Sequence, residues 1–224
     1  ARIIPVVKGT PGKNIMGAEI PPERVTKKNF KFSRNAYISE DGLELISKVN
    51  GHVTLEGDKI FISDVYDVPV DVDNTTGDIT YEGNIIVHGN VRAGFSLKAS
   101  GDITIMGVVE AANVEAGGGL TVNRGIQGMN KAVIRVGGDI TTKFVENATV
   151  VCGGSLETDS LLHCNTSAGG TINVNGKNGL LVGGTARAGS VVTAKQIGNT
   201  MGTVTNVYVG VDPMLRKRVK ELAE

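Results

Sequence analysis

The sequence predicts an all-β protein whose main body is a right-handed parallel β-helix, preceded by a small β-module and followed by the start of a helix. Three observations support this fold: a repeated glycine motif, apolar positions that recur with it, and uneven spacing between the copies. The motif is a glycine, a short residue and an aliphatic residue. Its glycines are Gly83, Gly101, Gly118, Gly138, Gly154 and Gly170.

The motif recurs at the length of one solenoid coil. The aliphatic residues of successive copies, from Ile85 to Ile172, are 18, 17, 20, 16 and 16 residues apart. This period is too short for a helical-hairpin repeat. Two further apolar positions recur in each coil, which predicts three short strands per coil with one face inward. One series is Leu97, Val114, Ile134 and Val150, and the other is Val91, Val109, Ile126, then Phe144 or Val145, then Leu162.

The repeated glycines are expected at the corners of the coils, because a tight bend needs φ values that a Cβ would penalise. Residues that suit the crowded inside of a corner stand two positions before the glycines. They are Ala99, Ala116, Val136, Cys152 and Ala168. Because one coil cannot bury its apolar face alone, stability is expected from the stacking of each coil on the next.

The uneven coil length favours the right-handed form. A left-handed β-helix keeps a strict six-residue period, which Ile79, Ile85 and Val91 follow. The period then slips to eight residues between Ile126 and Ile134. Coils that vary between 16 and 20 residues fit a right-handed β-helix, which tolerates uneven corners.

The same pattern divides the chain into three parts. Residues 1–76 lack the repeat, and Asp41-Gly42 and Asn50-Gly51 are hairpin signals, so this part is predicted to be a β-module that caps the solenoid. Residues 77–211 are the predicted β-helix. Residues 212–224 are rich in helix formers, with apolar residues at helical spacing, and predict the start of a C-terminal helix.

Composition limits the classes of function. The chain has 23 basic and 23 acidic residues, nine aromatic residues and no tryptophan. Nucleic acid is therefore not an expected partner, because its binders carry a basic face and, for single strands, stacking aromatics. No apolar run approaches the ~20 residues of a membrane span, and the first residues lack a signal-peptide layout. The expected location is the cytoplasm.

The two cysteines, Cys152 and Cys164, are expected to be buried, reduced thiols. They lie 12 residues apart, which matches no metal-ligand spacing. Cys152 occupies the inward corner position described above, and Cys164 is expected to face inward together with Leu162. No metal or other cofactor is predicted.

A β-helix enzyme is the alternative to a binding protein. A hexapeptide-type acyltransferase needs a histidine base, and the chain offers His52 in a turn region, His88 at an outward strand position, and His163. A polysaccharide-active enzyme needs carboxylates on one face, and Asp102 and Asp139 are the nearest candidates. Structural roles are favoured for all five residues, since short polar side chains at corners commonly bond their own backbone.

A basic cluster in the C-terminal segment is a candidate partner-binding site. Its residues are Arg216, Lys217, Arg218 and Lys220. The alternative is that these four side chains form an ordinary solvated helix face, as most runs of charge do. Self-association, through the ends of the β-helix or through helical extensions, is a further expectation.

Several motifs in order resemble the bacterial flagellar assembly protein A family. They include residues 73–83, residues 87–95, Gly9-Thr10-Pro11-Gly12 and the ending 198–210, so the resemblance covers nearly the whole chain. It implies a right-handed parallel β-helix with an N-terminal β-module. It also implies a non-enzymatic role in flagellar assembly, polar placement or regulation through protein partners. The family offers no catalytic motif to carry over to this sequence.

Overall fold

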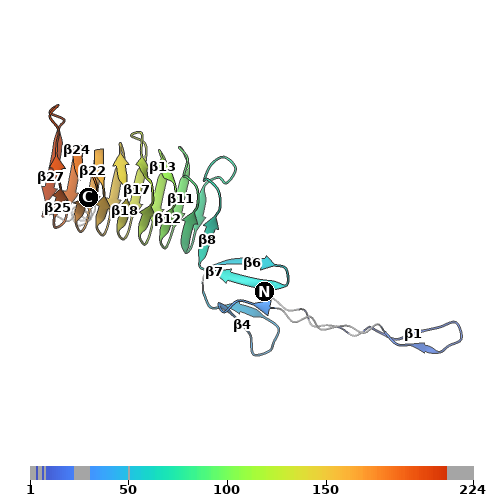
Figure 1. The fold of residues 1–224 in the computed structure, drawn as a ribbon. Helices are drawn as coiled ribbons and strands as arrows, with labels where there is room; N and C mark the ends of the chain where they lie inside the picture. The colour runs from blue at the N-terminus through green and yellow to red at the C-terminus, as the bar shows by residue number, and fades with distance from the viewer. Residues whose placement is uncertain (1–3, 5–6, 8, 23–30, 50, 211–224) are drawn as a thin grey trace, which may run out of the picture. The chain divides into compact units, whose positions relative to one another are not determined.

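The computed structural model describes residues 4, 7, 9–22, 31–49 and 51–210 (Figure 1). The chain forms two compact units, Ala1–Asp64 and Val65–Glu224. All the regular elements of the described residues are strands. The predicted C-terminal helix, 212–224, lies outside the described residues.

The second unit is a parallel β-solenoid whose coils each contribute to three ladders of strands (Figure 1). The first ladder is a separate eight-stranded sheet. Its strands are β8 (Val65–Val68), β10 (Asn84–Val87), β12 (Ile103–Ile105), β15 (Leu120–Val122), β18 (Ile140–Thr142), β21 (Leu156–Thr158), β23 (Ile172–Val174) and β25 (Val192–Ala194). Every pairing in this sheet is parallel.

The second and third ladders join into one twelve-stranded sheet because two long strands, β22 (Ser160–Ala168) and β24 (Leu180–Ala188), pass through both. The second ladder also contains β13 (Val108–Glu110), β16 (Gly125–Gln127), β19 (Phe144–Glu146) and β26 (Gln196–Ile197). The third also contains β9 (Ile79–Tyr81), β11 (Ser96–Ala99), β14 (Asn113–Ala116), β17 (Val133–Val136), β20 (Thr149–Cys152) and β27 (Thr205–Val209). Isolated bridges from Val72 to Val91 and from Val91 to Val109 extend the second ladder toward the first coil.

The strand register confirms the parallel β-helix read from the glycine motif. The aliphatic residues of the six copies are direct Cα partners in the first ladder, in the order Ile85, Ile103, Leu120, Ile140, Leu156 and Ile172. The series from Leu97 to Val150 is likewise in register in the third ladder. Three strands per coil, with an apolar face inward, are therefore confirmed.

The second-ladder series was wrong at its last member. Leu161, not Leu162, pairs with Val145, and Leu161 is fully buried while Leu162 is partly exposed. Cys164 still faces inward because His163 has a φ of 53°, in the left-handed region. That residue resets the alternation of side chains within β22, which period-two counting could not detect.

The core of the solenoid is aliphatic and becomes more polar along the chain. Its largest fully buried side chains are isoleucine, leucine and valine, from Val72 to Ile172. Three buried threonines, Thr142, Thr158 and Thr166, face inward in the later coils. The hydroxyls of the first two donate to nearby backbone carbonyls. The Thr166 hydroxyl is buried without a hydrogen-bond partner.

The first unit holds three small sheets among its described residues. They are the hairpin β1 (Gly12–Lys13) with β2 (Glu19–Ile20), the pair β4 (Ala36–Ile38) with β5 (Leu45–Ser47), and the sheet β3 (Lys31–Phe32), β7 (Lys59–Ser63), β6 (His52–Glu56). A small core of Ala36, Leu45 and Ile62 joins the last two sheets. The predicted β-module therefore exists, and its role as a cap for the solenoid stays a prediction.

The boundary between the two units lies earlier in the chain than the predicted division at residues 76–77. Val65–Val68 pairs in parallel with β10 and is the first strand of the first ladder. Val72, fully buried, already belongs to the solenoid core. The glycine motif missed this coil because no copy of the motif precedes Val65.

Removing the orphan hydroxyl is expected to stabilise the solenoid. In Thr166→Val, a methyl replaces a buried hydroxyl that has no partner, and the free energy of unfolding should rise by about 1 kcal/mol. Thr158→Val is the matched control, since its hydroxyl donates to the carbonyl of Ser160 at 3.3 Å and should give no gain. Urea unfolding followed by circular dichroism measures both. Equal effects of the two substitutions would contradict the assignment.

Candidate functional site

One corner of the solenoid is held by side chains that bond the next coil. In each case a short polar residue accepts a hydrogen bond from the backbone N–H of the residue at the same position one coil later. The bonds are Asp102 N–H to Asn84 Oδ1 (2.8 Å), Gly119 N–H to Asp102 Oδ1 (2.7 Å), Ser155 N–H to Asp139 Oδ1 (2.6 Å) and Thr171 N–H to Ser155 Oγ (3.2 Å). We call this row the corner ladder.

The corner glycines leave room for these side-chain oxygens. A Cβ on Gly118 would lie 2.2 Å from Asp102 Oδ1, and a Cβ on Gly154 would lie 2.1 Å from Asp139 Oδ1. Of the six predicted corner glycines, all within the described residues, only Gly83 has a positive φ, at 147°. The predicted reason for the glycines was therefore wrong for the other five: they are required by the close approach of successive coils.

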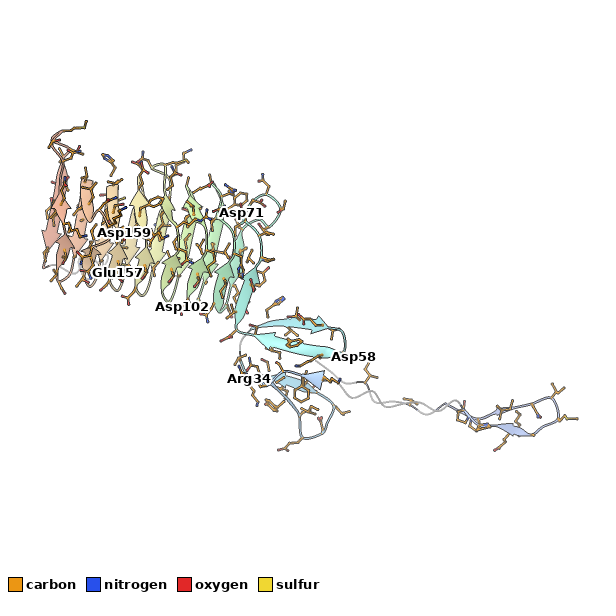
Figure 2. All side chains as sticks on the ribbon, viewed as in Figure 1. Arg34, Asp58, Asp71, Asp102, Glu157 and Asp159 are labelled. Carbon is orange, nitrogen blue, oxygen red and sulfur yellow. The ribbon has the colours of Figure 1, made fainter. Side chains whose placement is uncertain are left out.

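A second corner uses the same arrangement. Asn90 N–H donates to Asp71 Oδ1 at 2.8 Å, and Val108 N–H donates to Asn90 Oδ1 at 2.9 Å. A glycine again makes room for each oxygen. A Cβ on Gly89 would clash with Asp71 Oδ1, and a Cβ on Gly107 would clash with Asn90 Oδ1. Asp71 and Asp102 mark these two edges of the coils (Figure 2).

Arg92 ties three successive coils together at the second corner. Its Nη2 lies 2.7 Å from Asp71 Oδ2, and its Nη1 lies 2.8 Å from Glu110 Oε1. The backbone N–H of Asn90, followed by the Asn90 and Arg92 side chains, lowers the pKa of Asp71. The carboxylate is therefore held ionised within a structural network. Sequence reasoning missed this network, although its three members lie about one coil apart in the chain.

The carboxylates considered for catalysis belong to the corner ladder. Asp102 and Asp139 were expected to bond their own backbone, and this was wrong, since each accepts an N–H from the following coil. The coil between them contributes Gly119, which has no side-chain acceptor to continue the row. The structure therefore uses both residues to join coils and does not bring them together as a pair.

The three histidines occupy unrelated positions. His88 is exposed, and its Nε2 lies 2.9 Å from Asp67 Oδ1 on the adjoining coil. His163 is exposed at the left-handed position in β22. His52 was expected in a turn region, but it begins strand β6 of the first unit. Among the described residues, no hydrogen bond or ion pair joins a histidine to Asp102 or Asp139.

A groove of about 420 Å³, most of whose lining residues are polar in type, lies at the outer edge of the first ladder. Its charged lining residues are Lys143, Glu157 and Asp159, of which the two carboxylates are marked in Figure 2. Thr121 and Thr141 add hydroxyl groups from the outer face of β15 and β18. The sequence did not single out these residues, because they come from three successive coils and lie outside the glycine motif.

The third ladder presents one outward side chain from each of eight coils. By the strand register this row consists of Thr80, Lys98, Glu115, Arg135, Val151, Ser167, Arg187 and Tyr208. Glu115 lies between two cations, 3.1 Å from Lys98 Nζ and 3.6 Å from Arg135 Nη1. The guanidinium of Arg187 lies 5.2 Å from the ring centre of Tyr208. We call this surface the third-ladder row.

Both cysteines face the core, as predicted. Burial, with a smaller contribution from the charge of Asp139, raises the pKa of the Cys152 thiol to about 12. Burial also raises the pKa of Cys164, whose Sγ lies 3.1 Å from the Leu162 carbonyl oxygen. Neither thiol is therefore placed to act as a nucleophile at neutral pH.

The predicted partner-binding cluster at Arg216, Lys217, Arg218 and Lys220 lies outside the described residues. Within the described part of the chain, no group of three histidine, cysteine, aspartate or glutamate residues could hold a metal ion. That part also contains no helix long and apolar enough to cross a membrane.

Two family models match the chain and together cover nearly all of it. The Flagellar Assembly Protein A beta solenoid domain matches residues 64–224, and the Flagellar Assembly Protein A N-terminal region matches residues 1–58. The first match begins next to Val65, the first residue of the solenoid unit. No curated protein and no solved structure matches significantly.

Two adjacent glycines should respond differently to an added Cβ. Gly118→Ala places a Cβ 2.2 Å from Asp102 Oδ1 and should lower the free energy of unfolding by about 1–3 kcal/mol. Gly119→Ala is the matched control, because its nearest atom would be 3.4 Å away. Thermal and urea unfolding of the two variants test the close approach of the coils. A similar loss in both would refute it.

The two cysteine thiols should react very slowly with thiol reagents in the folded protein. At pH 8 Cys152 is almost entirely protonated, so labelling of both cysteines by a disulfide reagent should be at least ~100-fold slower than in unfolded protein. Labelling in buffer and in 6 M guanidinium chloride, read by absorbance, provides the comparison. Rapid labelling of either thiol without denaturant would be inconsistent with its burial.

Proposed function

The chain belongs to the Flagellar Assembly Protein A family, and on that basis we propose that it is a non-enzymatic scaffold. It would act in flagellar assembly, in polar positioning or in their regulation, by holding protein partners. The third-ladder row is the observation that carries the proposal. It offers eight side chains at one position of successive coils, at intervals of ~4.8 Å along a hydrogen-bonded sheet.

Such a row suits protein recognition because its side chains stand on a rigid backbone. The row has three basic residues, Lys98, Arg135 and Arg187, and one acidic residue, Glu115, so its net charge is positive. The backbone of a regular strand loses little freedom when a partner binds, so less of the interaction energy is used to order the binding surface. A partner with an acidic, extended surface would complement the row.

The use of the polar corner residues supports a scaffold over an enzyme. Asp71, Asp102 and Asp139 each accept a backbone N–H of the following coil. Arg92 is held between two carboxylates. Groups committed in this way stabilise the stacking of coils and are poor candidates for general acid or base work, which requires a group that can exchange a proton with a substrate.

A polysaccharide-active enzyme is the second candidate, favoured by the groove. Glu157 and Asp159 are the carboxylates of that groove, and Lys143 provides a cation beside them. Carboxylates and hydroxyls on an open groove are the groups that hold sugar hydroxyls. Hydrolysis of a glycosidic bond would need these two carboxylates to act as the acid and the base or nucleophile.

Matched charge reversals separate the two functions. Lys98→Glu with Arg135→Glu should abolish recovery of flagellar, polar-targeting or regulatory proteins by the chain with its native flanks, and should impair motility. The fold should persist because surface ion pairs contribute ~0–1 kcal/mol. Arg124→Glu with Lys131→Glu makes the same charge change at exposed sites outside the row and should preserve both properties.

The groove provides the opposing outcome. Glu157→Gln with Asp159→Asn should leave partner recovery and motility unchanged if the protein is a scaffold. Turnover in a polysaccharide screen by the natural protein, lost in this variant, would overturn the proposal in favour of an enzyme. Partner recovery and motility unaffected by reversal of the row would remove the row as the binding surface.

A further inference from the structure

Strand β6 lies at the edge of its sheet among the described residues. The three-stranded sheet of the first unit has the order β3, β7, β6, so β6 has a neighbour on one side only within the described chain. All five of its residues are exposed, including Val53 at 57% and Leu55 at 66%. We propose that two copies of the chain pair through β6, as antiparallel neighbours about a two-fold axis at Thr54.

The open backbone groups of β6 can be identified from the other side of the sheet. Ile60 O accepts from Ser33 N–H at 2.9 Å, and Ile62 N–H donates to Ser33 Oγ at 3.2 Å, so the backbone groups of both isoleucines point toward β3. Val53 lies opposite Ile62, and Leu55 opposite Ile60. In an antiparallel pair of strands, two opposite residues either both point their backbone N–H and C=O groups toward each other or both point them away from each other. Val53 and Leu55 therefore point their N–H and C=O groups away from β7, toward the open edge.

This arrangement is self-complementary. When a second β6 is laid antiparallel with Thr54 opposite Thr54, Val53 of one copy faces Leu55 of the other. Those two residues carry the outward N–H and C=O groups, so each such pair exchanges two hydrogen bonds. Thr54 then occupies a non-hydrogen-bonded pair on the axis, where opposite Cα atoms are only ~4.5 Å apart. A shift by one residue would leave the outward groups without partners.

The side chains match in the same register. Val53 and Leu55 lie on the face of the sheet that carries Ile60 and Ile62, and Ile62 belongs to the small core. Pairing would continue that apolar face across the axis and cover side chains that one copy leaves in water. At the ends of the strand, His52 of one copy would lie opposite Glu56 of the other.

The edge also lacks the usual protection against pairing. Exposed edge strands commonly carry lysine, proline or a bulge that prevents association. The residues of β6 are His52, Val53, Thr54, Leu55 and Glu56, without lysine or proline, and they pair with β7 without interruption. The second copy is the occupant favoured because the strand is complementary to itself in hydrogen bonds and in apolar contacts.

Five residues on each copy bury less than the ~1,200 Å² of standard interfaces, so a weak, reversible dimer is expected. A cysteine on the two-fold axis can trap it. Thr54→Cys places two thiols at Cα atoms ~4.5 Å apart, within the range of a disulfide. The native Cys152 and Cys164 are buried and do not compete.

The test is the rate of covalent dimer formation by the complete chain in an oxidised glutathione buffer, read on a non-reducing gel. Thr54→Cys should cross-link at least tenfold faster than Thr149→Cys, an exposed control on β20, which is paired on both sides. Adding Leu55→Lys to Thr54→Cys should remove that advantage, because charge at the axis opposes pairing. Sedimentation of the natural chain should show dimers that Leu55→Lys abolishes.

Three outcomes would overturn the proposal. Thr54→Cys could cross-link no faster than Thr149→Cys, or Leu55→Lys could leave the rate of cross-linking unchanged. Alternatively, the chain could sediment as a monomer at all concentrations, while Leu55→Lys abolishes the recovery of one partner protein by the chain. That result would assign the edge of β6 to a strand of another protein. Circular dichroism of each variant confirms that the substituted edge remains folded.

Discussion

At two corners of the solenoid, the backbone N–H of one coil reaches a side-chain oxygen of the previous coil because a glycine leaves the space between them empty. At the corner ladder, Asp102 Oδ1 occupies the position that a Cβ on Gly118 would need, and accepts the N–H of Gly119. The arrangement recurs at Asp139 and Gly154. At these positions the glycine makes room for the side-chain oxygen, and the oxygen in turn satisfies the N–H of the residue that follows the glycine. The coil stacking that buries the aliphatic core depends on this fit.

The same constraint separates structural side chains from those available to partners. At the corners, aspartate, asparagine and arginine are engaged between coils, as Asp71 and Arg92 illustrate. Along the strands, alternate residues point outward and are held at fixed spacing, which produces the third-ladder row. The polar side chains at the corners therefore hold neighbouring coils together, and the outward residues of the strands form a repetitive surface. The scaffold role proposed above needs both properties.

The sequence predicted the solenoid well because the fold needs an aliphatic residue at each inward position and a glycine at each close approach of two coils, and both recur with every coil. The aliphatic positions from Ile85 to Ile172 were in register throughout. Prediction failed where a single backbone conformation changes the pattern, as at His163, or where a coil lacks the motif, as at β8. The candidate surfaces were harder to find, since the third-ladder row and the Arg92 network join residues separated by whole coils.

Amide hydrogen exchange at single residues tests the central claim most directly. If Asp102 holds the following coil through its side chain, Asp102→Ala should expose the N–H of Gly119 and speed its exchange at least tenfold. The N–H of Ser155, which bonds Asp139, should remain protected in the same sample. Unchanged exchange at Gly119, measured by NMR, would contradict the account, because the corner would then be held without its side-chain acceptor.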